Sequence, residues 1–105
     1  MNLRGYISSR ALYDGSFVDQ SIQNMIIRQA CEKRSYNFHL SNTEYGMLDC
    51  FLMLEKTINE LKGTEIDGIA FFSIHQLSKG EILQKLFKES MKRKKIIFFC
   101  HQNIL

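Results

Sequence analysis

The chain has 105 residues, of which 45% are hydrophobic and 24% charged, and its formal net charge is +3. These values exclude a disordered or fibrous protein, and the length suits one domain covering residues 1–105. The longest apolar runs, 68–72 and 96–100, are far shorter than the roughly 20 residues of a membrane helix, so no membrane partner is expected. Because the first residues lack an apolar signal core, we expect a cytoplasmic location.

The first part of the chain alternates between strand and helix patterns. Residues 3–8 predict a strand that leads into a polar turn, and Ser16 with Asp19 resembles a capping box. Apolar residues recur at helical spacing after it, beginning with Val18, Ile22 and Met25 or Ile26, and predict a helix that ends near residue 34. Residues 36–40 alternate between apolar and polar, which predicts a partly exposed second strand before a loop at 41–46.

The second part repeats this order. An apolar stripe from Leu48 to Leu61 predicts a helix that Gly63 closes as a C-cap. Residues 68–72 are apolar throughout, as is expected of a strand covered on both faces. Residues 78–81 form a capping box that opens a third helix, whose buried stripe ends at Met91. Residues 96–100 form a last apolar strand.

This order of elements determines the expected fold. Strands joined by helices of this length run parallel with right-handed crossovers. Two strands that are apolar on both faces need helices above and below them. We therefore expect an α/β fold: a small, doubly wound, four-stranded parallel sheet in the order 2-1-3-4 with three helices.

The expected ligand site follows from this topology. In a parallel sheet, the ligand crevice lies beyond the carboxyl ends of the strands, where the strand order reverses. Hydroxyl, imidazole and guanidinium groups at this place can bind a phosphate or carboxylate, or act in catalysis. Ordinary loop polarity explains the same residues equally well, and the sequence assigns no catalytic residue. The predicted ligand-binding residues directly follow the first three strands: Ser8, Ser9, Arg10, Glu44, Tyr45, Ser73, His75 and Gln76.

No metal ion and no cofactor are predicted. The three cysteines lack CxxC spacing, and no cluster of His, Cys or Asp has the spacing of metal ligands. Neither GxGxxG nor GxxxxGK[ST] occurs, which argues against a dinucleotide or a P-loop nucleotide. The basic run at 92–95 complements a helix dipole and keeps a sheet edge soluble, with an anion-binding surface as the alternative. Nucleic acid is not an expected partner, because no aromatic stacking positions interleave with these cations.

Four stretches of the chain carry a resemblance to a known family. They are RGYISSR at 4–10, QSIQNMIIR at 20–28, TEYGM at 43–47 and DGIAFFS at 67–73. Together they resemble the sporadic carbohydrate cluster proteins, a small bacterial family named for its scattered occurrence in gene clusters for surface-polysaccharide synthesis. The resemblance covers most of the chain. It implies a setting more than a reaction, and binding or modification of a sugar phosphate or nucleotide sugar is one function that fits this setting.

A more distant resemblance is to the catalytic domain of serine recombinases (resolvases), which is also a small doubly wound domain of flavodoxin-like type. Residues 5–10 keep the frame of that family's first strand, but Ser8 stands where the family has arginine and Arg10 where it has the nucleophilic serine. Residues 75–79 likewise replace an Asp-Arg-Leu-x-Arg segment. Because phosphoryl transfer needs several guanidinium groups around the phosphate, the resemblance implies the fold without the activity.

The sequence leaves several functions open, and also whether the chain is an enzyme at all. The first is binding or modification of a carbohydrate-derived small molecule. The second is a non-catalytic interaction module for a polysaccharide-synthesis enzyme. A degenerate recombinase-like domain that binds nucleic acid is a weaker third. A domain of this size has a large surface for its core, which also favours a homodimer.

Overall fold

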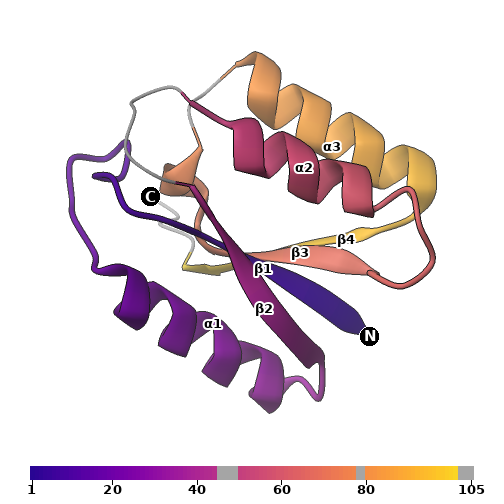
Figure 1. Cartoon of the computed structure of the whole chain (residues 1–105), viewed down its shortest axis with the longest axis horizontal. Helices are drawn as coiled ribbons and strands as arrows, with labels where there is room; N and C mark the ends of the chain where they lie inside the picture. The colour runs from indigo at the N-terminus through magenta and orange to yellow at the C-terminus, as the bar shows by residue number, and fades with distance from the viewer. Residues whose placement is uncertain (45–49, 78–79, 102–105) are drawn as a thin grey trace.

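The computed structural model describes residues 1–44, 50–77 and 80–101 (Figure 1). Within them all strands are parallel and lie in the order β2-β1-β3-β4, which confirms the predicted α/β fold with three helices. None of the described helices is long and apolar enough to cross a membrane. The elements in chain order are β1 (Asn2–Ser8), α1 (Gln20–Lys33), β2 (Asn37–Glu44), α2 (Leu52–Glu60), β3 (Gly68–Ser73), the 3-10 helix η1 (Ile74–Gln76), α3 (Glu81–Arg93) and β4 (Ile96–His101).

The sheet is covered on both faces, by α1 on one side and by α2 and α3 on the other (Figure 1). Alternate side chains of each strand point to opposite faces. On β3, Ile69 and Phe71 join the core under α2 and α3, whereas Ala70 and Phe72 join the core under α1. Every residue of β3 is buried, as its uninterrupted apolar sequence predicts.

The start of α1 and its buried face differ from the expectation. Ser16 is not the N-cap, because its hydroxyl and its N–H both donate to Asp14 Oδ1, at 2.6 and 3.0 Å, within a turn. The helix begins after Asp19. Its buried residues are Gln23, Ile27 and Cys31 at a spacing of four. The expected apolar face was therefore wrong for Ile22 and Met25, which are exposed, whereas Ile26 is partly buried against the core.

Strand β2 is longer than expected, because residues 41–44 continue the ladder with β1. Asn42 lies opposite Tyr6 and Glu44 lies opposite Ser8, after an irregularity between Arg4 and Tyr6. The loop expected at 41–46 is therefore wrong for residues 41–44, and its last two residues lie outside the described part. β2 is an edge strand, and this explains why a polar sequence extends it.

The ends of α2 and α3 also depart from their sequence signals. Leu61, in right-handed backbone, is the C-cap of α2, so the C-cap expected at Gly63 is wrong. The helix begins at Leu52 with Phe51 as N-cap, and the expected start at Leu48 lies outside the described residues. The capping box at 78–81 falls partly on residues 78–79, which are also outside that range.

The last helix and strand are more exposed than predicted. Met91 is 79% exposed, because the buried residues of α3 are Leu86 and Ser90, one turn apart. Residues 96–100 of β4 are only half-buried. The sequence predicted that helices would cover both faces of β4. Because β4 is an edge strand of a small sheet, the helices cover it less completely.

Candidate functional site

Two buried glutamine side chains fill the crevice where β1 and β3 diverge. The ladder between these strands ends at Tyr6 opposite Phe71. Beyond it, Gln23 Nε2 donates to the carbonyl of Ser8 at 2.9 Å, and Gln23 Oε1 accepts from the Ser8 N–H at 3.0 Å. Gln76 Nε2 donates to the carbonyl of Tyr6 at 3.1 Å and to Gln23 Oε1 at 3.2 Å. The glutamine pair, Gln23 and Gln76, therefore takes the place of ladder bonds between the strands.

This pair fills the crevice in which the sequence predicted a ligand site, where the strand order reverses. Gln76 is 1% exposed, and its Oε1 also accepts from the N–H of Ser73 at 3.1 Å. Its amide is thus fully used in holding the loop after β3 against β1. Ser8 is likewise 1% exposed, with its backbone held by Gln23, and its Oγ is buried without a hydrogen-bond partner among the described residues. Ser8 and Gln76 are brought together as predicted, but as part of the packed interior.

Glu44 caps helix α2 from the end of a neighbouring strand. The carboxylate is 3% exposed and accepts hydrogen bonds from the backbone N–H groups of Met53, at 3.1 Å, and Leu54, at 3.2 Å. It also accepts from the Tyr6 hydroxyl at 2.9 Å. A carboxylate at a helix N-terminus satisfies free N–H donors and interacts favourably with the helix dipole. The Glu44 carboxylate thus takes up the N–H donors at the N-terminus of α2 that could otherwise bind an anionic ligand.

Arg10 is buried beside this carboxylate. It is 7% exposed, its Nη1 donates to the carbonyl of Cys50 at 2.6 Å, and its guanidinium lies 4.6 Å from the centre of the Phe51 ring. Burial raises the pKa of Tyr6, as do the charge and hydrogen bond of Glu44, while Arg10 opposes the shift. Arg10 and Glu44 therefore both act on the Tyr6 hydroxyl, and Arg10 is covered by the Phe51 ring.

His75 lies on the more open side of the same end of the sheet. Ser73 Oγ accepts from the His75 N–H at 3.1 Å, which caps η1, and the His75 carbonyl accepts from the Tyr13 N–H at 2.7 Å. These bonds fix the loop after β1 against the loop after β3. A cavity of about 440 Å³ opens here, within the range of small-molecule sites. This His75 pocket is lined by Tyr13, Asp14, Ile74, His75, Leu77 and Leu83.

The polar groups of the His75 pocket are set by local bonds. Hydrogen bonds from Ser16 lower the pKa of Asp14, and the nearby His75 lowers it further, so the carboxylate is ionised at neutral pH. Ser16 donates both hydrogen bonds to the same oxygen of this carboxylate, Asp14 Oδ1. The Tyr13 ring stacks on Phe51, with the ring centres 6.4 Å apart and an angle of 21° between the planes. The pocket thus combines an aromatic ring, a carboxylate and an imidazole.

The predicted residues separate into three groups. Gln76 is a member of the glutamine pair and Ser8 is bonded to that pair, whereas Arg10 and Glu44 lie at the buried N-terminal cap of α2. His75 lines the pocket, and the buried Ser73 holds its N–H from behind. Ser9 binds the Glu44 carbonyl through its N–H at 3.0 Å and its hydroxyl at 3.4 Å, and Tyr45 lies outside the described residues.

Sequence reasoning missed four residues that shape this end of the molecule: Gln23, Tyr13, Asp14 and Phe51. Gln23 carried a signal, since it stands four residues before Ile27 and eight before Cys31, on the buried face. Phe51 lies in the apolar stripe that predicted the second helix, but the stripe gives no sign of its contacts with Arg10 and Tyr13. Tyr13 and Asp14 lie in a loop, whose position no periodicity reveals.

Among the described residues, no three His, Cys, Asp or Glu side chains gather as a metal ion would require. Comparison with known proteins gave no match to a family model, to a curated protein or to a solved structure.

Proposed function

We propose that this chain binds a carbohydrate-derived small molecule of surface-polysaccharide synthesis, and that the His75 pocket holds its sugar ring. The observation that carries the proposal is the meeting of Tyr13, Asp14 and His75 in one cavity. The resemblance of the sequence to the sporadic carbohydrate cluster proteins supports the same ligand class.

The pocket suits the two kinds of surface that a sugar presents. The C–H groups of a sugar ring form an apolar face that packs on an aromatic ring such as Tyr13, beside Leu77 and Leu83. Sugar hydroxyls donate hydrogen bonds, and an ionised carboxylate makes the stronger, charge-assisted kind. Asp14 keeps one oxygen outside its bonds with Ser16, and the imidazole of His75 can donate or accept.

The charges of the pocket favour a neutral ring over a phosphate. Asp14 is anionic, and it would repel a phosphate in the cavity. Arg10, the cation expected to bind a phosphate, is buried and covered by Phe51. The sugar portion of a sugar phosphate or nucleotide sugar would therefore enter the pocket, and its phosphate would stay in solvent.

Calorimetry with the methyl glycosides of glucose, galactose, rhamnose and N-acetylglucosamine, and with glucose 1-phosphate, tests the proposal. We expect Asp14→Asn and His75→Ala to weaken binding of the best glycoside by about tenfold each, because the first removes the charge of a hydrogen-bond acceptor and the second removes a hydrogen-bonding side chain. Asn keeps the turn with Ser16 while removing the charge.

The matched controls are Asp19→Asn and His39→Ala, which change the same residue types outside the pocket. Both should bind like the wild type. If no glycoside binds, or if the pocket variants keep full affinity, the proposal is wrong.

A second candidate function is self-association as an interaction module. Phe17 is 65% exposed, Ile22 45% and Met25 50%, and the last two lie three residues apart on one face of α1. A second copy packed on this face would remove the side chains of Ile22 and Met25 from water. Light scattering at increasing protein concentration should then give a dimer that Met25→Glu converts to a monomer. A wild-type monomer at all concentrations would exclude this candidate.

A further inference from the structure

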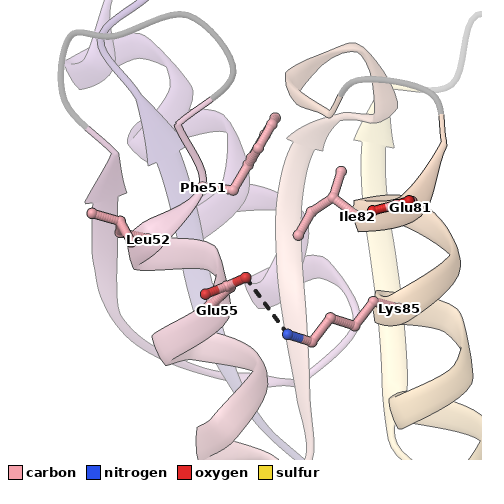
Figure 2. A pocket seen from close by; sticks show the side chains of 6 residues that line it. All are labelled: Phe51, Leu52, Glu55, Glu81, Ile82 and Lys85. Atoms are coloured by element: carbon pink, nitrogen blue, oxygen red, sulfur yellow. Dashed lines mark ion pairs between the residues drawn. The ribbon is translucent and has the colours of Figure 1, made fainter.

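A second cavity lies between the N-terminal ends of α2 and α3. Its volume is about 370 Å³, and its lining residues are Phe51, Leu52, Glu55, Glu81, Ile82 and Lys85. Figure 2 shows Phe51 and Ile82 on opposite sides of this α2–α3 groove, with the ion pair between Glu55 and Lys85 spanning it. The two charged atoms of that pair are 3.5 Å apart, and both side chains are about half exposed.

The α2–α3 groove borders the His75 pocket. Phe51 lines the groove, and its ring stacks on Tyr13, which lines the pocket. The first turn of α3 also belongs to both, since Ile82 lines the groove and the next residue, Leu83, lines the pocket. The two cavities therefore adjoin at the stacked rings and at the first turn of α3, so one extended ligand can contact residues of both.

The chemistry of the groove resembles that of the pocket. Each has one aromatic ring, apolar side chains and carboxylates that can accept from hydroxyl groups. Among the residues that line the groove, Lys85 is paired with Glu55, and Glu81 adds a second carboxylate. The two cavities together therefore carry an excess of negative charge, which opposes a diphosphate and accepts neutral sugars.

We propose that the α2–α3 groove is a second sugar subsite, so that the ligand is an uncharged oligosaccharide of at least two linked sugars. The inference rests on the proposed function, since the first sugar occupies the His75 pocket. It adds a substrate class: a saccharide chain, with no nucleotide carrier bound at the site.

The experiment compares each methyl glycoside with methyl disaccharides that contain the same sugar, methyl maltoside and methyl lactoside among them. We expect the best disaccharide to bind about tenfold more tightly than its monosaccharide, since its second sugar contacts Ile82 and its hydroxyl groups donate to the Glu81 carboxylate. Ile82→Trp fills the groove and should abolish this gain while monosaccharide affinity stays unchanged. Lys88→Trp, which places the same side chain elsewhere on α3, should keep the gain.

The outcomes separate this inference from the proposed function. If the monosaccharide binds but no disaccharide binds more tightly, or if the gain survives in Ile82→Trp, the second subsite is wrong and the first stands. If UDP-glucose binds more tightly than every disaccharide, the charge argument is wrong. If no saccharide binds at all, the proposed function fails, and the second subsite fails with it.

Discussion

Gln76 Nε2 donates a hydrogen bond to Gln23 Oε1 at 3.2 Å, and this contact closes the crevice between β1 and β3. In doubly wound sheets the ligand commonly binds at this divergence. Here two side-chain amides satisfy the backbone groups that the diverging strands leave unpaired. A ligand at this end of the sheet would therefore bind outside this crevice, and the His75 pocket is the position that we propose.

Replacing Gln23 by leucine should destabilise the fold by about 1–3 kcal/mol, because the buried N–H and carbonyl of Ser8 lose their partners. The free energy of unfolding in urea measures this. Gln29→Leu, on the exposed side of the same helix, should change it by less than about 0.5 kcal/mol. Equal effects of the two substitutions would show that the glutamine pair contributes nothing specific.

The topology could be predicted from the sequence because β3 is apolar throughout and each helix has an apolar face. The packing of side chains at the carboxyl ends of the strands could not be predicted. A glutamine within a helix is typical of a solvated face, and only the buried end of β1 makes Gln23 a substitute for backbone pairing. Glu44 shows the same limit, since a polar residue after an alternating strand predicts a loop, while pairing with Ser8 keeps it in β2.

Glu44→Gln should destabilise the fold by about 1–3 kcal/mol, since the neutral amide makes weaker bonds with the N–H groups of Met53 and Leu54 and loses the favourable interaction with the helix dipole. Thermal unfolding followed by circular dichroism measures the loss. Glu65→Gln, at an exposed position, is the matched control and should leave the unfolding temperature unchanged. An unchanged Glu44→Gln variant would contradict the role of this carboxylate as a cap.

Stability should fall as the pH rises above about 10, in part because of Tyr6. Burial and Glu44 raise its pKa in the folded state above the ordinary value of 10.0, so the unfolded chain loses this proton first. The unfolded state then binds fewer protons, and each pH unit above 10 removes up to about 1.4 kcal/mol for one such group. Urea unfolding across this range should give a flatter pH dependence for Tyr6→Phe. Parallel curves for the two proteins would contradict the prediction.

Gly68→Ala should destabilise the fold by about 1–3 kcal/mol, the usual range for overpacking a buried position. A Cβ at Gly68 would collide with the backbone carbonyl of Ile96 in the paired strand β4, and a backbone group cannot rotate away. At Gly63 the nearest atom to an added Cβ is the Glu60 carbonyl oxygen at 3.6 Å, an ordinary contact. Gly63→Ala should therefore unfold like the wild type in urea, and an equally mild Gly68→Ala would show that β4 can move away from β3.

Chemical-shift mapping of the isotope-labelled protein during titration with its best methyl glycoside tests the position of the site most directly. With the sugar in the His75 pocket, the backbone amides of Tyr13, Asp14 and His75 shift with one common affinity, and those of Ser8 and Arg10 stay in place. The largest shifts at Ser8 and Arg10, with none at Asp14 and His75, would place the ligand at the strand divergence and contradict the proposed site.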